Sequence, residues 1–220
     1  DVRAGQVMFS TSDIGWVVGH SYNVYGPLIA GATSILYEGL PTSPDAGVWW
    51  RICETYGVRT MFSSPTAVRV LKKQDEAWLK RYDLSKFQWL FLAGEPLDEP
   101  TARWITDGLG KSVIDNYWQT ETGWPVLCLM PGVELKPVKF GSPGLPAPGY
   151  RLRVINEVTG EDAPAGEKGV LVIEPPMPPG CLTTVWRNDA RFLASYFGHF
   201  KDLLYSSLDW AIRDEDGYTF

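Results

Sequence analysis

Short apolar runs alternate with longer amphipathic stretches from the start of the chain to Gly123. Short runs rich in β-branched and aromatic residues predict strands, whereas apolar residues that recur with a helical period predict helices. We predict strands at residues 7–9, 33–37, 58–62, 89–93 and 113–116. Strands that alternate with helices favour a parallel sheet covered by helices, so the expected fold class is α/β with a mostly parallel sheet.

Glycine, proline and capping residues mark where the intervening helices begin and end. Three glycines each follow a periodic stretch and predict a helix end: Gly31, Gly57 and Gly110. Pro65 begins one helix, and Asp98 with Pro100 begins another. Ser21 is the expected N-cap of the first helix, at 22–30.

Beyond Pro131 the pattern no longer alternates strand and helix. Residues 141–149 are rich in glycine and proline, which excludes a helix there. The remaining segments predict one short helix at 189–197 and strands at 150–155, 169–174, 205–212 and 218–220. We therefore expect an α/β subdomain at 1–140, followed by a small mixed-β, barrel-like subdomain at 141–220.

The composition is typical of a soluble globular protein, with 45% hydrophobic and 21% charged residues. A net charge of −6 speaks against a nucleic-acid partner, which would need a basic patch. No apolar run reaches the ~20 residues of a membrane span, and the first residues do not resemble a secretory signal. Cys53, Cys128 and Cys181 are widely spaced and favour neither a disulfide framework nor a zinc site, so we expect a cytoplasmic protein.

Polar or glycine-bearing segments follow four of the five predicted strands. They are 13–20 after the first strand, 63–65 after the third, 93–96 after the fourth and 117–123 after the fifth. Open α/β sheets bind ligands at the carboxyl ends of their strands, which share one edge when the strands are parallel. Together the four segments predict a cleft at that edge, although each alone is more typical of a turn that starts the next helix.

The last of these segments, Tyr117-Trp118-Gln119-Thr120-Glu121-Thr122-Gly123, carries the most chemistry. A hydroxyl can hold a phosphate oxygen, a carboxylate can bind Mg²⁺, and a tryptophan can wall an apolar pocket. The alternative interpretation is a polar loop with one core tryptophan.

Further motifs occur along the chain in a fixed order with this segment: Gly94-Glu95-Pro96 before it, then Asp209 and Asp214-Glu215-Asp216-Gly217-Tyr218 after it. In this order they resemble the acyl-adenylate-forming (AMP-binding) superfamily. Residues 15–22 and 37–39 are similar to its acetyl- and propionyl-CoA synthetase branch. The resemblance covers essentially the whole chain, as an internal piece of the large N-terminal domain of such enzymes.

The resemblance implies a nucleotide site. The segment 94–96 matches the part that lines the adenine pocket, and Asp209 matches the aspartate that binds the ribose hydroxyls. Thr120 matches the hydroxyl that contacts the α-phosphate, and Glu121 matches the carboxylate associated with Mg²⁺, so these two are the candidate catalytic residues. The residues that lead into them complete the nucleotide site: Asp115, Asn116, Tyr117, Trp118 and Gln119.

The resemblance also implies an acyl pocket and a path for CoA. Trp118 matches the wall that limits the pocket to short acids, and Ser64 matches a position near the CoA thiol. The other expected sides of the pocket are Trp16, Val17, Val18 and Ala93. Acetyl-activating members typically carry Thr at position 18 and Val at position 93. The smaller alanine leaves room for a longer acid, and because one methylene is worth roughly 1–3 kcal/mol, the pocket favours propionate.

The implied activity is the formation of propionyl-CoA, AMP and diphosphate from propionate, ATP and CoA through an acyl-AMP, with Mg²⁺ as cofactor. The alternatives are an acetyl-CoA synthetase, an enzyme that delivers its acyl group to a carrier protein, and a non-catalytic nucleotide-binding fragment or pseudoenzyme. The expected partners are small-molecule substrates and the remaining parts of the same enzyme.

Parts that such enzymes use do not occur in this sequence. A Ser/Thr/Gly-rich phosphate loop is expected before Asp1, and a hinge and a C-terminal domain with its lysine are expected after Phe220. We therefore expect the chain by itself to form no acyl-AMP. Residues 205–209, Tyr-Ser-Ser-Leu-Asp, also depart from the commoner Thr/Ser-Gly-Asp pattern, which leaves open the path of the strand around Asp209.

Overall fold

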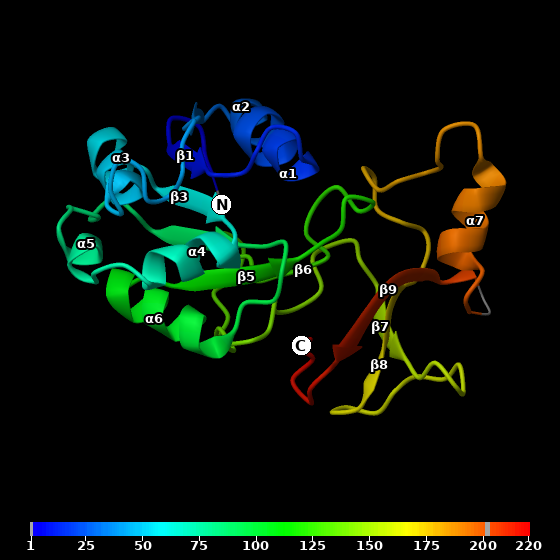
Figure 1. The fold of residues 1–220 in the computed structure, drawn as a ribbon. Coiled ribbons are helices and arrows are strands. Elements are labelled where there is room, and N and C mark those ends of the chain that lie inside the picture. The colour runs from blue at the N-terminus through cyan, green and yellow to red at the C-terminus, as the bar shows by residue number, and fades with distance from the viewer. Residues whose placement is uncertain (1, 201–202) are drawn as a thin grey trace. The chain divides into compact units, whose positions relative to one another are not determined.

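The structure, a computed structural model, describes residues 2–200 and 203–220 (Figure 1). The chain forms two compact units. The first unit runs to Asn116 and includes Met130–Gly141, and the second consists of Tyr117–Leu129 and Ser142–Phe220. The loop that follows the fifth strand therefore belongs to the second unit.

Parallel strands form the sheet of the first unit, which confirms the expected α/β class with a mostly parallel sheet. Neighbouring strands pair in the order β2-β1-β3-β4-β5, and each of these pairs is parallel. The strands are β1 (Val7–Ser10), β2 (Thr33–Ile35), β3 (Thr60–Ser63), β4 (Trp89–Leu92) and β5 (Val113–Tyr117).

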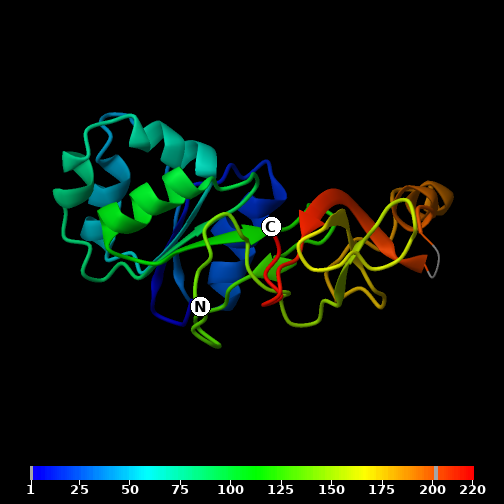
Figure 2. The ribbon, with the colours of Figure 1, turned by 90° about the horizontal axis from the view of Figure 1, so that it is seen from below.

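One face of this sheet is covered by helices that share a hydrophobic core with it. These helices are α3 (Val48–Tyr56), α4 (Pro65–Lys72), α5 (Ala77–Lys80) and α6 (Glu99–Leu109). Phe9, Met61 and Leu90 are aligned across three neighbouring strands and contribute to that core with Trp50 and Ile105. Figure 2 shows α4 and α6 side by side. Alternate strand residues thus face this helical layer, as expected for a sheet buried on both faces.

The opposite face packs against an irregular helical segment, where the predicted helix start is wrong. The segment comprises α1 (Val17–Gly19), the π-helix η1 (His20–Tyr25) and α2 (Gly26–Ile29). Tyr22 stacks on Phe62 of β3 with ring centroids 4.3 Å apart. Ser21 lies inside η1 rather than at a helix start. The chain already turns before it, at Gly19, where a Cβ would lie 2.2 Å from the Asp13 carbonyl oxygen.

Caps set the other helix boundaries in this unit. Ser64 and Asp98 accept N-cap hydrogen bonds from Ala67 and Thr101. Gly57 and Gly110 end α3 and α6 in the left-handed conformation, as predicted. Strand β3 begins two residues later than expected because Val58 N–H closes α3 by donating to the Cys53 carbonyl.

The second unit contains a three-stranded antiparallel sheet, in agreement with the expected small β-subdomain that follows the parallel sheet. Its strands pair in the order β7-β8-β9. They are β7 (Leu152–Ile155), β8 (Lys168–Ile173) and β9 (Tyr205–Ile212), and the unit also contains β6 (Leu127–Cys128) and α7 (Asp189–Phe197). Helix α7 and β9 have the predicted bounds. The strand predicted at 218–220 is reduced to isolated bridges of Thr219 with Gly144 and Arg213.

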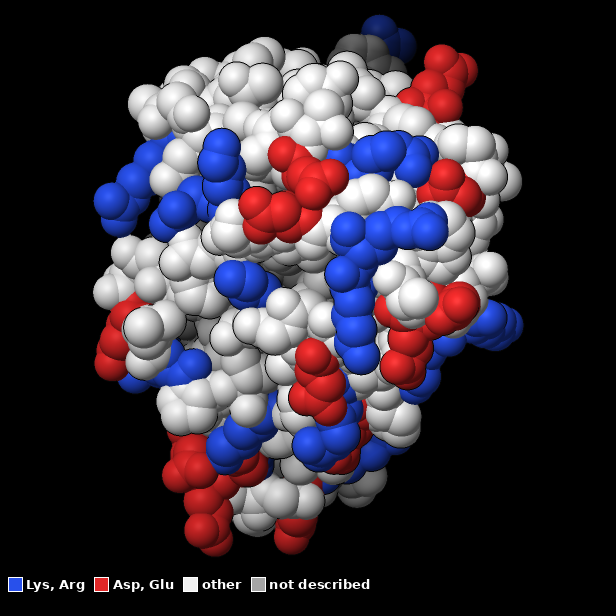
Figure 3. Space-filling view, turned by 90° about the vertical axis from the view of Figure 1, so that its left-hand side faces the viewer, with Lys and Arg blue, Asp and Glu red and all other residues white. Residues whose placement is uncertain are grey.

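Three further observations concern the surface, the helices and the cysteines of the described residues. Acidic and basic side chains are interspersed on the face seen from the left-hand side of Figure 1 (Figure 3). Within 2–200 and 203–220, each helix is too short or too polar to pass through a bilayer. Cys53, Cys128 and Cys181 are buried, and no disulfide joins them.

Candidate functional site

The segment 117–123 forms a compact turn in the second unit. Thr122 is buried, and its hydroxyl both accepts from Gln119 N–H at 3.1 Å and donates to the Gln119 carbonyl at 2.9 Å. Gly123 has a left-handed φ of 72°, and a Cβ there would lie 2.9 Å from the Gly180 carbonyl oxygen. Glycine is therefore required at this position for both backbone and packing reasons.

Asp209 lies at the centre of a hydrogen-bond cluster with this turn. Its Oδ2 accepts from the Tyr117 phenol at 2.5 Å and from Gln119 Nε2 at 2.8 Å. Gln119 Nε2 also donates to the Ser207 carbonyl at 2.7 Å, and Gln119 Oε1 accepts from the Tyr205 phenol at 3.2 Å. Burial raises the pKa of Tyr117 above its usual value, and the bond to Asp209 raises it further, so the phenol remains a donor.

A bulge in β9 presents Asp209. The pairing of β8 with β9 shifts between Val170 and Val172. Leu208 adopts a left-handed φ of 64°, which is the conformation that glycine takes freely in the commoner pattern. Hydrogen bonds from Leu208 N–H to Ser206 Oγ (3.3 Å) and from Asp209 N–H to Ser207 Oγ (3.1 Å) stabilise the bulge. The bulge therefore places Leu208, where the commoner pattern has glycine, in the left-handed conformation directly before Asp209.

Three further predicted residues lie in the same turn. Thr120 is exposed, and its side chain makes no hydrogen bond with any residue that the structure describes. Glu121 Oε1 accepts from the Tyr196 phenol at 2.7 Å. Trp118 is buried, with 9% of its surface exposed. The turn therefore offers one free hydroxyl and one anchored carboxylate.

In the first unit, the structure brings four strand ends together. Thr11, just after β1, has its hydroxyl 2.8 Å from that of Ser63 at the end of β3. Ala93 N–H, just after β4, donates to the Ser63 carbonyl at 3.2 Å. Asn116 Nδ2 in β5 donates to the Leu92 carbonyl at 2.9 Å. The ends of β1, β3, β4 and β5 therefore lie side by side at the carboxyl edge of the sheet, and the cleft expected there stays a prediction.

The loop 94–98 is held by Arg69 of α4, a residue that the sequence analysis did not single out. Its guanidinium pairs with Glu95 at 3.0 Å and Asp98 at 2.9 Å and donates to the Pro96 carbonyl at 2.6 Å. Glu95 also accepts from Thr66 N–H at 2.7 Å. Burial opposes ionisation of Glu95 and Asp98, but the hydrogen bonds outweigh it and lower the pKa of both, that of Asp98 to about 2.

Asp115 and Asn116 lie near the end of β5, and each side chain makes a hydrogen bond within the first unit. Asp115 Oδ1 accepts from Asn116 N–H at 2.9 Å. Burial raises the pKa of Asp115 to about 7, and hydrogen bonds from the backbone of Asn116 and Leu97 offset part of that effect. Asp115 thus links β5 to the loop that carries the segment 94–96.

The remaining candidates in this unit differ in exposure. Ala93 is buried at 5%, Val17 and Val18 are half-buried, and Trp16 is 70% exposed. Ser64 Oγ accepts from Ala67 N–H at 3.3 Å, so its hydroxyl caps α4. Its assignment to the CoA path stays a prediction, as do the assignments to the acyl pocket.

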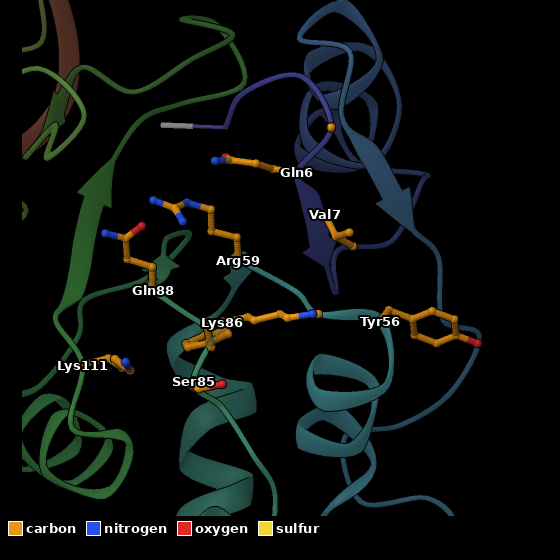
Figure 4. A pocket seen from close by; sticks show the side chains of 11 residues that line it. Gln6, Val7, Tyr56, Arg59, Ser85, Lys86, Gln88 and Lys111 are labelled. Carbon is orange, nitrogen blue, oxygen red and sulfur yellow. The ribbon is translucent and has the colours of Figure 1, made fainter.

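A cavity of about 600 Å³ lies at the other ends of the strands (Figure 4). Its lining includes Gln6, Arg59 and Gln88, each of which directly precedes a strand. Lys86 packs its side chain against Gly57 at the C-terminal end of α3, where a cation is favourable. This cavity is at the amino edge of the sheet, whereas the motifs follow the carboxyl ends.

Sequence reasoning missed Tyr196, Tyr205 and Arg69. Tyr196 lies 75 residues from its partner Glu121, and Arg69 lies 26 residues from Glu95. No local period or spacing signals such pairs. The one local feature of Arg69 is its place in the last turn of a helix, which indicates no partner in a loop beyond the next strand.

Comparisons with known proteins show what the chain is similar to. The family model described as AMP-binding enzyme matches residues 1–178. The chain is 57% identical to a propionate–CoA ligase of Salmonella typhimurium and 56% identical to one of Escherichia coli, in each case over 99% of this chain and 35% of the relative. It is 41% identical to an acetyl-coenzyme A synthetase of Pyrobaculum aerophilum, over 100% of this chain and 33% of the relative.

A solved structure shares the fold as well. The crystal structure of an acyl-CoA synthetase from Brucella canis matches with a TM-score of 0.84 and 32% identity, over 99% of this chain and 38% of that chain. The chain thus spans about a third of the length of the curated relatives that it matches. From the family match and these identities together, the chain belongs to the AMP-binding enzyme family.

Proposed function

We propose that this chain is part of an ATP-dependent short-chain acyl-CoA synthetase whose substrate is propionate. A carboxylate oxygen of propionate attacks the α-phosphorus of ATP, and diphosphate leaves. The CoA thiol then attacks the acyl carbon of propionyl-AMP, and AMP leaves. The observation that carries the proposal is the turn 117–123, which contains Thr120 and Glu121 and is hydrogen-bonded to Asp209 through Tyr117 and Gln119.

Asp209 is suited to bind a ribose diol. A carboxylate has about four acceptor positions, and two of them are taken by Tyr117 and Gln119. The remaining positions can accept the two ribose hydroxyls, while the two protein donors keep the carboxylate in one orientation. Fixing the carboxylate in advance lowers the entropic cost of nucleotide binding.

Thr120 and Glu121 are suited to the α-phosphate. The Thr120 hydroxyl has no competing partner among the described residues and can donate to a phosphate oxygen. Catalysis of phosphoryl chemistry of this kind rests on positioning and on neutralising the charge of the phosphates, which needs no covalent enzyme intermediate.

The donor set fits Mg²⁺ bound jointly with the nucleotide. Within the described part of the chain, no three His, Cys, Asp or Glu side chains gather into a metal cage. Mg²⁺ in phosphate-transfer sites is held through one or two carboxylates together with substrate phosphates, and Glu121 supplies such a carboxylate. When bound, the ion neutralises negative charge on the phosphates.

Propionate is the proposed acid because Ala93 is small and two relatives carry the name propionate–CoA ligase. Acetate is the second candidate, since other relatives are named acetyl-coenzyme A synthetase. The test is the kcat/KM of the full-length enzyme for propionate and acetate, before and after Ala93→Val. We expect the larger side chain to reduce the preference for propionate about tenfold or more. A higher kcat/KM for acetate in the unmodified enzyme would overturn the substrate assignment.

A second experiment separates the remaining alternatives. Residues 1–220 alone are expected to show no propionate-dependent ATP–diphosphate exchange, while the full-length protein shows it. Absence of exchange in the full-length protein would indicate a pseudoenzyme. Transfer of the acyl group to a carrier protein in preference to CoA would indicate the carrier-dependent class. The cytoplasm is the proposed location.

A further inference from the structure

Both the carboxylate and the backbone carbonyl of Glu121 accept hydrogen bonds within the second unit. Its Oε1 accepts a 2.7 Å hydrogen bond from the phenol of Tyr196 in α7. Its backbone carbonyl accepts a 2.6 Å hydrogen bond from Leu182 N–H. Among the residues that the structure describes, Tyr196 is the one side chain that hydrogen-bonds to this carboxylate.

Aromatic packing fixes Tyr196 in turn. Its ring stacks on Tyr205 with centroids 5.2 Å apart and planes 5° from parallel, and Phe192 lies 5.6 Å away. The Tyr205 phenol donates to Gln119 Oε1 at 3.2 Å. Two stacked tyrosines thus direct their hydroxyls to two residues of the same turn, Gln119 and Glu121.

The Tyr196 hydroxyl is a reliable donor. Its phenol donates its O–H to Oε1 of Glu121 over 2.7 Å. Because the donor is uncharged, it orients the carboxylate without cancelling the negative charge that a cation would need.

We propose that Tyr196 is a positioning residue that holds the Glu121 carboxylate ready for Mg²⁺. This inference rests on the proposed function, because it assigns a support to the same site. Hydrogen-bonded partners of metal-binding carboxylates set their orientation, and removing such a partner typically weakens metal affinity by about 10- to 100-fold. Helix α7 thus supports the proposed metal site through Tyr196, which the sequence of the helix did not indicate.

The test uses Tyr196→Phe in the full-length protein, because it removes the hydroxyl and keeps the ring on Tyr205. One readout is the Mg²⁺ concentration that half-saturates propionate-dependent ATP–diphosphate exchange. The other needs no turnover: Mn²⁺ binding followed by electron paramagnetic resonance in the presence of a non-hydrolysable ATP analogue. We expect both metal constants to weaken by about 10- to 100-fold, with a much smaller change in kcat at saturating Mg²⁺.

Two further variants show whether the hydroxyl acts through Glu121. Tyr56→Phe changes a tyrosine that is 60% exposed in α3 and is expected to leave both constants unchanged. When Glu121→Gln is already present, adding Tyr196→Phe is expected to have no further effect on Mn²⁺ binding.

The outcomes separate this inference from the proposed function. Unchanged Mn²⁺ affinity in Tyr196→Phe, or a Tyr196→Phe effect that persists fully in the Glu121→Gln background, overturns the role of Tyr196. If the unmodified protein shows no ATP–diphosphate exchange with any short acid, the proposed function is overturned instead. The Mn²⁺ binding measurement then still tests the role of Tyr196, because it needs no turnover. An unmodified protein that binds no Mn²⁺ overturns the inference as well.

Discussion

The phenol of Tyr117 donates a 2.5 Å hydrogen bond to Oδ2 of Asp209, which lies 92 positions later in the chain. Tyr117 is the last residue of β5, and Asp209 lies in the bulge of β9. Gln119 Nε2 donates to the same oxygen at 2.8 Å. The side chain proposed to bind ribose is therefore oriented by two residues of the turn proposed to bind the phosphates.

Tyr117→Phe removes one of these two donors and keeps the ring. A hydrogen bond to a charged group is worth roughly 1.5–3 kcal/mol, so we expect KM for ATP to rise by about 10-fold or more while kcat changes less. Steady-state kinetics of the full-length enzyme measure both constants, with Tyr56→Phe as the control. An unaltered KM for ATP would show that Gln119 alone orients Asp209.

Leu208→Gly is expected to stabilise the protein. Leu208 has a φ of 64° and is 56% exposed, so glycine relieves the backbone strain and little burial is lost. Because glycine also gains freedom in the unfolded chain, the net gain should be about 1 kcal/mol or less. Urea unfolding measures the difference in unfolding free energy between the variant and the unmodified protein. The matched control is Leu193→Gly, at a leucine of α7 that is 54% exposed. Because glycine is unfavourable inside a helix, this control should lose about 1 kcal/mol of unfolding free energy.

Gly123→Ala should destabilise the turn more than an equally strained glycine elsewhere. Gly123 and Gly160 have φ angles of 72° and 73°, but only at Gly123 would a Cβ meet a neighbour, the Gly180 oxygen at 2.9 Å. Both alanine variants carry a left-handed cost of about 1–2 kcal/mol, and Gly123→Ala adds the clash. Equal losses of unfolding free energy in the two variants would contradict the close approach of Gly180.

Asp115→Asn should change how stability depends on pH. The folded-state pKa of about 7 lies above the ordinary value, so the folded state binds the proton more tightly than the unfolded chain. The stability that the protonated group supplies is complete below about pH 4 and is lost as pH rises to about 7. Asparagine does not ionise, so this loss is absent in the variant. Between pH 4 and pH 8, the unfolding free energy of the variant should therefore rise relative to that of the unmodified protein by up to about 4 kcal/mol.

The measurement for Asp115→Asn is the unfolding free energy across that pH range. Asp107→Asn changes an exposed aspartate of α6 and serves as the control. A constant difference between Asp115→Asn and the unmodified protein at every pH would mean that Asp115 ionises in the folded state as it does in the unfolded chain.

Local sequence signals were sufficient for most of the fold. Periodicity and capping residues located all five parallel strands of the first unit, and they gave α7 and β9 their observed bounds. They failed at Ser21, where the chain has already turned at Gly19 beside Asp13 and η1 replaces a regular helix. They also failed at 218–220, since a strand needs a continuous partner and Thr219 finds only isolated bridges.

The sequence by itself determined the element order and the strand-end motifs, because these depend on neighbours a few positions apart, and the resemblance of those motifs to a known family supplied the residues proposed to carry the chemistry. Only the tertiary structure decided which side chains hold them: Tyr117 on Asp209, Tyr196 on Glu121 and Arg69 on Glu95. It also decided that Leu208 takes the left-handed conformation usual for glycine. Such contacts join residues far apart in the chain, and they are set by how the elements pack rather than by any local pattern.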